Sequence, residues 1–154
     1  MDQFAQRGVK SEGLIPVFVS KTFPNHYSIA TGLYAENHGL IGNHFYDPKF
    51  DDHYTLSDRS KVEDPKFYGG EPIWVTAEKQ GVNTASYFWV GTEAPIKNTF
   101  PRKWKTYEHG FPFESRIDSV VSWLSLPEKK RPKLCMLYFH CLLYTSDAAD
   151  DLVC

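Results

Sequence analysis

The sequence has few cysteines, no excess of basic residues and no long apolar run. Its three cysteines, Cys135, Cys141 and Cys154, all lie in the last 20 of the 154 positions. The first 134 positions therefore hold neither a disulfide framework nor a cysteine-based zinc site, and the redox compartment stays open. The net charge of −2 argues against binding to a nucleic-acid polymer, because such binding needs clustered Lys and Arg side chains that displace counterions.

No stretch reaches the roughly 18 apolar residues that a membrane span needs. The residues after Met1 are Asp2, Gln3 and Phe4 rather than the basic and then apolar region of a signal peptide. The composition, 42% hydrophobic and 23% charged, is typical of a globular chain with a core. Aromatic residues make up 16%, and many stand among polar residues, where they either face a planar ligand or cover shallow clefts.

Apolar runs and turn residues predict an α/β fold with a mostly parallel sheet flanked by helices. Short apolar runs predict strands over residues 14–19, 84–89 and 133–139. Helical spacing and boundary residues predict helices over residues 1–9, 24–31, 73–80 and 113–126. Residues 33–70 contain many Gly, Pro, Asp and Asn residues, which indicates a loop-rich surface excursion. The alternation of strands and helices implies parallel strand pairing.

Thr22 stands where the first predicted strand turns into the helix that begins at Pro24. A hydroxyl at a helix N-terminus lies among unpaired backbone N–H groups and the positive end of the helix dipole, which favours an anion or an alkoxide nucleophile. Threonine is also a common N-cap. The spacing alone therefore leaves both roles open.

A series of short motifs follows Thr22 at regular positions along the chain. They are PVFVSKTFPNHY at 16–27, ATGLY at 30–34, ENHG at 36–39, GN at 42–43, YDP at 46–48, GEPIWVT at 70–76 and FWVGTE at 88–93. Further matches are FP at 100–101, Tyr107 and LYF at 137–139. In these residues the chain resembles the ecto-nucleotide pyrophosphatase/phosphodiesterase family, and the resemblance covers residues 1–140.

The resemblance implies that the chain is a fragment of an alkaline-phosphatase-like α/β fold that works with two zinc ions. Thr22 would contact the metal and act as the nucleophile that attacks phosphorus and forms a covalent nucleotidyl intermediate. Asn43 would donate its amide N–H₂ to a phosphate oxygen as charge builds there. The alternative for Asn43 is that of a turn residue after Gly42.

In the nucleotide-cleaving members of the family, aromatic side chains hold the base and polar side chains contact its edge. The matching positions here are Phe23, Leu56, Lys61, Trp89, Glu93 and Tyr107. Phe23 and Tyr107 would sandwich the ring, an interaction that tolerates different bases. Glu93 stands where the family often has Asp, and Val90 replaces a usual Pro, so the base preference does not carry over. Each of these positions also has simple packing as its alternative.

The resemblance assigns none of five histidines to zinc. His26, His38 and His44 stand at positions that the family does not use for metal, and His53 and His109 fall in polar loops where a solvated imidazole is usual. The zinc ligands of the family would lie upstream of Met1 and beyond residue 140. Because a zinc site needs three or four ligands, we expect the 154-residue chain to bind zinc poorly and to be inactive, unlike its full-length parent.

We interpret the chain as a partial phosphodiesterase catalytic domain at residues 1–140 and a non-native tail at residues 141–154, with a genuine divergent tail as the alternative. The resemblance implies a small-molecule nucleotide or other phosphodiester substrate. It also implies a location outside the cytoplasm, with any signal or membrane anchor in a missing N-terminal part. Two alternatives for the parent are a phosphocholine or lysophospholipid phosphodiesterase of the same family and a non-catalytic remnant of the fold.

Overall fold

The computed structural model describes residues 2–9 and 11–140, so the predicted tail at 141–154 lies outside the described residues. The helices are α1 (Asp2–Arg7), α2 (Thr22–Thr31), α3 (Ala35–His38), α4 (Arg59–Val62), α5 (Ile73–Lys79) and α6 (Phe113–Leu124), with short 3₁₀ turns η1 (Pro65–Phe67) and η2 (Ile96–Asn98). The strands are β1 (His44–Asp47), β2 (Asp52–Thr55), β3 (Thr84–Tyr87), β4 (Lys103–Lys105) and β5 (Leu134–Leu137).

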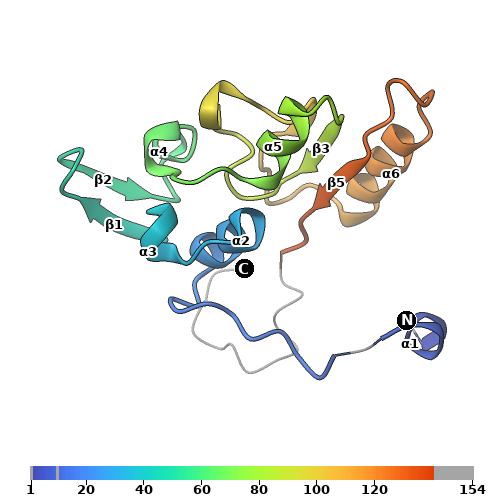
Figure 1. Cartoon of the computed structure of the whole chain (residues 1–154), viewed down its shortest axis with the longest axis horizontal. Coiled ribbons are helices and arrows are strands. Elements are labelled where there is room, and N and C mark those ends of the chain that lie inside the picture. Colours follow the sequence, from blue (N-terminus) through green and yellow to red (C-terminus); the bar gives the residue numbers. More distant parts are fainter. Residues whose placement is uncertain (1, 10, 141–154) are drawn as a thin grey trace.

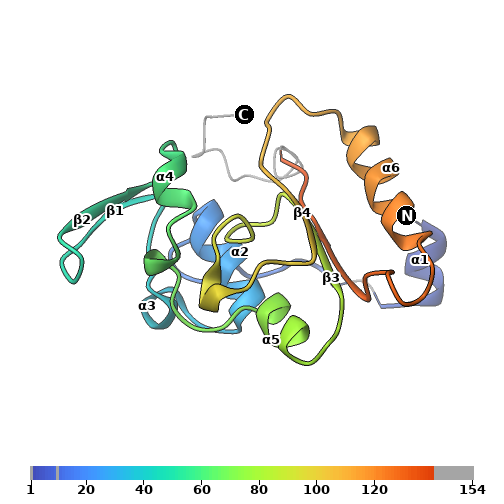
Figure 2. The ribbon, with the colours of Figure 1, turned by 90° about the horizontal axis from the view of Figure 1, so that it is seen from above.

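The centre of the fold is a parallel sheet with the strand order β4-β3-β5. Ala85 of β3 pairs with Lys103 of β4 on one side and with Cys135 of β5 on the other. All four residues of β3 are buried, as expected for a central strand covered on both faces. Helix α6 lies alongside β5 at one end of the molecule, the β1–β2 hairpin lies at the other end, and α2 lies between them (Figures 1 and 2). The predicted α/β class with a parallel sheet is confirmed.

Helix α2 ends where its sequence predicts, but it begins at Thr22, two residues before the predicted start at Pro24. Pro24 lies in the first turn, and Gly32 ends the helix in the left-handed conformation, φ 69°, where its N–H donates to the carbonyl of Ser28 at 2.8 Å. The ring of Tyr27 is fully buried and packs edge-on against the rings of His38 and Tyr68. Helix α2 is therefore fixed to the core at its middle, which sets the position of Thr22 at its start.

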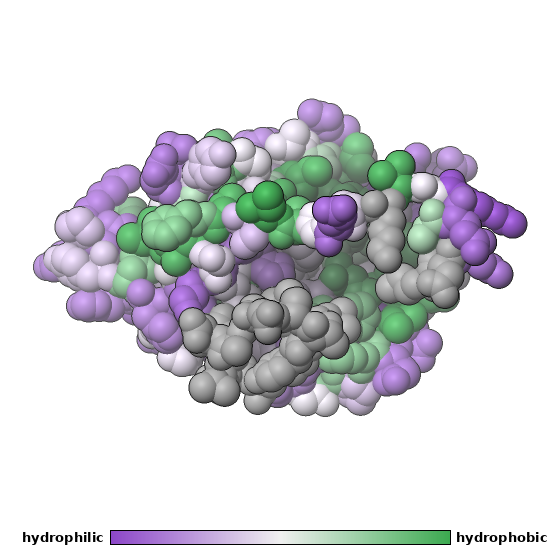
Figure 3. All heavy atoms as spheres, turned by 90° about the horizontal axis from the view of Figure 1, so that it is seen from below, coloured by the Kyte–Doolittle hydropathy of each residue, from purple (hydrophilic) through white to green (hydrophobic). Residues whose placement is uncertain are grey.

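The predicted strand over residues 14–19 is wrong. This segment has no regular secondary structure, and Leu14, Ile15 and Phe18 are exposed. The N–H of Val17, which a neighbouring strand would bind, instead donates to Oδ1 of Asn25 at 3.0 Å. An apolar run has the composition of a strand but needs a partner for its backbone groups, and no described segment pairs with this one. Figure 3 shows the molecule from below relative to Figure 1, and hydrophobic residues gather on the face seen there.

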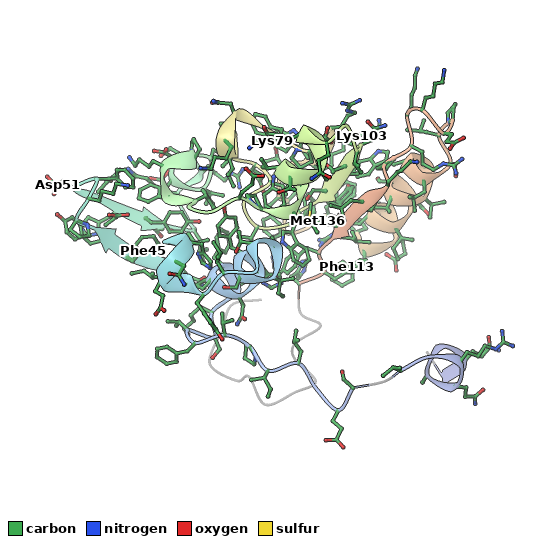
Figure 4. The ribbon with its side chains drawn as sticks, viewed as in Figure 1. Phe45, Asp51, Lys79, Lys103, Phe113 and Met136 are labelled. Atoms are coloured by element: carbon green, nitrogen blue, oxygen red, sulfur yellow. The ribbon has the colours of Figure 1, made fainter. Side chains whose placement is uncertain are left out.

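The predicted surface excursion over residues 33–70 is also wrong. The segment forms α3, the antiparallel β1–β2 hairpin, α4 and η1, and it contributes buried side chains to the core, namely Leu40, Tyr54, Val62, Phe67 and Tyr68. The core extends from this hairpin, marked by Phe45, to the parallel sheet, marked by Met136 (Figure 4). The turn residues occur where the chain reverses, but the aromatic residues between them stack on one another and exclude water.

The other predicted elements occur with small shifts in their ends. The helices at 73–80 and 113–126 are α5 and α6, the strands at 84–89 and 133–139 are β3 and β5, and the helix at 1–9 is α1. Strand β4 (Lys103–Lys105) was not predicted, since it has only three residues and two of them are lysines. Among the described residues, no helix has the length and apolar character needed to cross a membrane.

Candidate functional site

A cavity of about 810 Å³ opens at the carboxyl ends of the parallel strands. Residues that follow all three strands line it, including Phe88 after β3, Tyr107 after β4 and Tyr138 after β5. The start of α2 and the segment after the β1–β2 hairpin close the opposite side. Ligands of open α/β sheets bind outside the carboxyl ends of the strands, so the cavity lies where such a fold places a site.

Seven of the eight residues that the sequence analysis singled out line this one cavity. They are Thr22, Phe23, Asn43, Leu56, Trp89, Glu93 and Tyr107. The eighth, Lys61, does not line it. Its Nζ lies 2.6 and 2.7 Å from the two carboxylate oxygens of Asp52, on the hairpin side of α4. The fold thus brings together positions that are up to 85 residues apart in the sequence, from 22 to 107, and leaves Lys61 outside.

Thr22 and Asn43 lie together at the N-terminus of α2. Thr22 is the first helical residue, and the N–H of Phe23 donates to Oδ1 of Asn43 at 3.1 Å. Pro24 has no N–H, so the first turn of α2 presents fewer unpaired backbone donors than the start of a helix without proline. Because the carbonyl oxygen of the Asn43 side chain accepts this bond, its N–H₂ group is the part of the amide left to act as a donor.

His26 connects the start of α2 to the far wall of the cavity. Its Nδ1 lies 2.7 Å from the carbonyl oxygen of Thr22, which can only accept, so Nδ1 carries the proton. Burial lowers the pKa of His26, and the imidazole is therefore neutral at pH 7. Its ring meets Trp89 and Tyr138 edge-on at 5.3 and 5.2 Å, and Nε1 of Trp89 donates to the carbonyl of His26 at 3.2 Å.

Glu93 lies at the centre of a charged network at the other end of the cavity. Its side chain is only 6% exposed. Oε1 accepts the backbone N–H of Tyr107 at 3.0 Å, and Oε2 accepts from Nη2 of Arg59. Nη2 of Arg59 also donates to Glu63 at 2.8 Å, one turn further along. The sequence analysis missed Arg59, because nothing in its polar surroundings separates it from the other cations of residues 59–66.

Aromatic rings form two walls of the cavity. On one wall Phe23 packs against Tyr54, with ring centroids 6.2 Å apart. On the other, Tyr107 meets Phe88 edge-on at 5.2 Å. Phe88 has a left-handed backbone, φ 69°, which is uncommon for a bulky residue and turns the chain sharply after β3. Phe88 was missed because the predicted strand ran to residue 89, whereas β3 ends at Tyr87 and leaves Phe88 at the carboxyl end of the strand, where sites of such folds lie.

Arg116 supports the second wall from α6. Its side chain is fully buried and donates to the carbonyls of Phe111 at 2.8 Å, Tyr138 at 3.2 Å and His109 at 3.3 Å. Its guanidinium also lies over the ring of Phe88, 4.8 Å from the centroid. One buried cation therefore joins the segments after β3, β4 and β5. Such a role is not visible in the helical periodicity that predicted α6.

Two histidines at the cavity lie against each other. The rings of His109 and His140 stack with centroids 4.2 Å apart, and Nδ1 of His109 lies 3.0 Å from the hydroxyl of Tyr107. His109 is exposed, as its polar loop suggested, but it lines the cavity together with His44 and His140. His140 was not singled out, although it follows directly on a predicted strand.

The residues of this cavity do not by themselves fit a zinc site. Within residues 2–9 and 11–140, no group of three or more His, Cys, Asp and Glu side chains converges as a zinc site requires. His38 is fully buried against Ser28, with its Nε2 2.9 Å from the serine hydroxyl, and His53 lies at the exposed hairpin. We therefore derive no chemical step through a metal from this geometry.

The model of the family described as type I phosphodiesterase / nucleotide pyrophosphatase matches residues 1–142. The chain belongs to this family. It is 47% identical over 131 residues to human ectonucleotide pyrophosphatase/phosphodiesterase family member 1, and 44% identical over 131 residues to venom phosphodiesterase CdcPDE from Crotalus durissus collilineatus. Each alignment covers 85% of the chain. The chain spans only 14% and 16% of the lengths of these two family members.

Solved structures agree with this assignment. Murine ectonucleotide pyrophosphatase/phosphodiesterase 5 matches with a TM-score of 0.78 and 33% identity, over 84% of this chain and 34% of that one. An inactive threonine-to-alanine variant of the same murine protein, in complex with AMP, matches with a TM-score of 0.78 and 32% identity. The described residues thus form part of the alkaline-phosphatase-like fold of the family, with the cavity at the carboxyl ends of its strands.

Proposed function

We propose that the protein to which this chain belongs is a hydrolase that cleaves phosphodiester or pyrophosphate bonds of nucleotides through Thr22. The observation that carries the proposal is the convergence of Thr22, Asn43 and the aromatic walls on one cavity. Family membership supports the reaction class. The AMP complex of an inactive threonine-to-alanine variant in murine family member 5 supports a nucleotide ligand and the need for a threonine.

In the proposed reaction, the hydroxyl oxygen of Thr22 attacks phosphorus, and the bond from phosphorus to the leaving oxygen breaks. Water then attacks the same phosphorus and releases Thr22, so that one water is consumed for each bond cleaved. Asn43 donates N–H₂ to a non-bridging phosphate oxygen, a role for which the bond from Phe23 N–H to its Oδ1 orients the amide. The position of Thr22 at the positive end of α2 favours both the incoming phosphate and the oxygen nucleophile.

The base of the nucleotide would lie between the aromatic walls, with Phe23 and Tyr107 stacking on the ring and Leu56, Trp89 and Glu93 around it. Lys61 is not included, because its ammonium group pairs with Asp52 away from the cavity. Stacking contributes roughly 1–3 kcal/mol per base and accepts any base, so it fits a phosphodiesterase of broad range.

We also propose two zinc ions for the complete enzyme, with Thr22 as the contact to the metal from this part of the chain. The remaining ligands would come from segments outside the described residues. On this view the 154-residue chain by itself binds zinc poorly and is inactive. The names of the relatives, an ectonucleotide enzyme and a venom enzyme, support a location outside the cytoplasm for this protein as well.

The test is hydrolysis of a nitrophenyl nucleotide ester by the protein expressed from the complete gene, after the DNA on both sides of this reading frame has been sequenced. We expect chelator-sensitive activity that Thr22→Ala abolishes while AMP binding remains. Thr31→Ala, at the other end of α2, is the matched control and should retain activity. Full activity of Thr22→Ala, or hydrolysis by the purified 154-residue chain, would contradict the proposal. Faster hydrolysis of a choline ester than of any nucleotide would favour the phosphocholine alternative.

A further inference from the structure

The buried guanidinium of Arg116 binds groups from two cavity segments at once. Nη1 donates to the carbonyl of Tyr138 at 3.2 Å, and Nη2 donates to that of His109 at 3.3 Å. Nε and Nη2 also donate to the carbonyl of Phe111, at 3.1 and 2.8 Å, and Nη2 lies 3.3 Å from Nδ1 of His140. Burial of a cation carries a large desolvation cost that an apolar side chain at this position would avoid. The role of Arg116 therefore lies in the groups that it binds.

Arg116 holds each of three aromatic neighbours of the Tyr107 ring. The ring of Phe88 meets Tyr107 edge-on at 5.2 Å, and the guanidinium lies 4.8 Å from the centroid of the Phe88 ring. The rings of His109 and Tyr138 each lie 6.3 Å from that of Tyr107, and Arg116 binds the carbonyls of both residues. Tyr107 itself has no hydrogen bond to Arg116 within the described residues, so Arg116 acts on this ring through its neighbours.

The sheet alone does not fix these neighbours relative to one another. The strand pairing ends at Tyr87, Lys105 and Leu137, before the three segments reach the cavity. Arg116 joins the segments beyond that point, because a planar guanidinium offers five donors in fixed directions. A lysine at this position would carry the same charge on a single atom and would hold fewer of these groups at once.

The phosphate end of the cavity is fixed by other contacts. Thr22 begins α2, and the buried ring of Tyr27 holds the middle of this helix in the core. Asn43 accepts a backbone N–H from the first turn of the same helix. Arg116 takes part in none of these contacts, so a change at Arg116 should affect the base end of the cavity far more than the phosphate end.

We propose that Arg116 is a positioning residue for the base end of the cavity. It keeps the neighbours of Tyr107 in place, and they hold the ring of Tyr107 where it stacks on a nucleotide base. Stacking tolerates different bases but requires contact between the faces of the two rings, so a displaced ring loses much of it. This inference rests on the proposed nucleotide function, and it assigns to Arg116 the affinity for the base rather than the attack on phosphorus.

The experiment compares two substrates of the protein expressed from the complete gene. One is a nitrophenyl nucleotide ester, and the other is methyl nitrophenyl phosphate, which has the same leaving group but no base. For Arg116→Lys we expect the KM of the nucleotide ester to rise about tenfold, since a displaced ring loses most of one stacking contact. The kcat of this ester and both constants of the methyl ester should change less than about twofold. A small change in kcat is expected because Tyr138 also meets the ring of His26 in α2 at 5.2 Å.

Tyr107→Ala tests whether Arg116 acts through this ring. Alone, it should raise the KM of the nucleotide ester by about tenfold or more and leave the methyl ester unchanged. The double variant with Arg116→Lys should equal Tyr107→Ala, because a ring that is absent cannot be displaced. A purely structural role of Arg116 would instead add its own loss on both esters.

Val75→Ala is the matched control for loss of stability. Val75 is fully buried in α5 and does not line the cavity, so this substitution should lower Tm and leave the constants of both esters unchanged below the melting transition.

If Arg116→Lys does not fold, Phe113→Leu takes its place. The ring of Phe113, labelled in Figure 4, lies 4.7 Å from the guanidinium and outside the cavity lining. Its loss removes one contact that holds the cation, and should raise the KM of the nucleotide ester about threefold with no effect on the methyl ester.

The outcomes separate this inference from the function on which it rests. Equal losses on the two esters, or additive losses in the double variant, overturn the role of Arg116 and leave the nucleotide site standing. An unchanged KM in Arg116→Lys, or in Phe113→Leu if that variant replaces it, does the same. No hydrolysis of the nucleotide ester by the unsubstituted protein, or no effect of Tyr107→Ala, overturns the proposed base site and the inference with it.

Discussion

Asn43 has two separable tasks, and substitutions at this position test both. Its Oδ1 accepts the N–H of Phe23 in the first turn of α2, and its N–H₂ is proposed to bind phosphate. Its own carbonyl accepts the N–H of Leu56 at 3.0 Å, so the backbone stays fixed whatever side chain is present. Asn43→Ala removes both tasks, whereas Asn43→Asp keeps the acceptor for Phe23 and removes the donor.

The expected magnitudes follow from these contacts. Asn43→Ala loses a capping bond on a half-buried helix end, which should lower the free energy of unfolding by about 1 kcal/mol. For a chain of 154 residues this corresponds to a fall in Tm of about 2–4 °C. Asn43→Asp should be as stable as the unsubstituted chain or gain about 0.3–1 kcal/mol, because a negative charge near the start of α2 is favourable.

Nucleotide binding should change in the opposite order. Loss of one donor to a charged phosphate costs about 1.5–3 kcal/mol, so Asn43→Ala should bind AMP at least tenfold more weakly. Asn43→Asp also brings a carboxylate against the phosphate and should bind more weakly still. Thermal melts and calorimetric titration with AMP measure the two effects on the same samples. AMP binding by Asn43→Asp at the unsubstituted level would refute the phosphate role, and an unchanged Tm for Asn43→Ala would refute the capping role.

Three further predictions concern the core behind the cavity. Tyr27→Phe removes the hydroxyl of a fully buried side chain, which donates to the carbonyl of Gly69 at 2.9 Å, and should lower the free energy of urea unfolding by about 1–2 kcal/mol; no change would mean that this carbonyl finds another donor. Gly69→Ala would place its Cβ 2.8 Å from the backbone oxygen of His38, and should destabilise the chain by about 1–3 kcal/mol, as measured by the same unfolding assay; a variant as stable as the parent would show that this backbone contact relaxes freely. Burial lowers the pKa of His38 below its ordinary value of 6.5. On acidification the unfolded state therefore binds a proton at this residue before the folded state does. Stability should be full above pH 6.5 and should fall below it by up to about 1.4 kcal/mol per pH unit. His38→Gln should flatten this dependence in melts recorded from pH 7.5 to pH 5, and an unchanged slope would assign the proton to another group.

Local signals predicted the elements whose boundaries are set by single residues. Gly32 ends α2 because it adopts a left-handed backbone, and Pro24 fits the first turn although the helix begins two residues earlier, at Thr22. The run at 14–19 could not be placed, because whether an apolar segment becomes a strand depends on a partner that local sequence does not specify. The same holds for residues 33–70, where turn residues indicated loops but distant aromatic contacts decide burial.

The fold brings seven of the eight positions that the resemblance supplied to one cavity, but it leaves out Lys61, for which side-chain direction decides. Lys61 and Arg59 are both cations of α4, two positions apart. Residues at this spacing project from different faces of a helix, so only one of them faces the cavity. A one-turn helix has no periodic pattern from which its orientation follows, and the choice depends on Asp52 attracting Lys61 and on Glu93 attracting Arg59.

The bond that holds Glu93 in place has a consequence for how this pocket can vary. It uses the main-chain N–H of Tyr107, which every residue except proline supplies. The ring at position 107 can therefore be exchanged without loss of the anchor for the Glu93–Arg59 pair. The strength of stacking at position 107 can thus change while the Glu93–Arg59 pair keeps its backbone anchor.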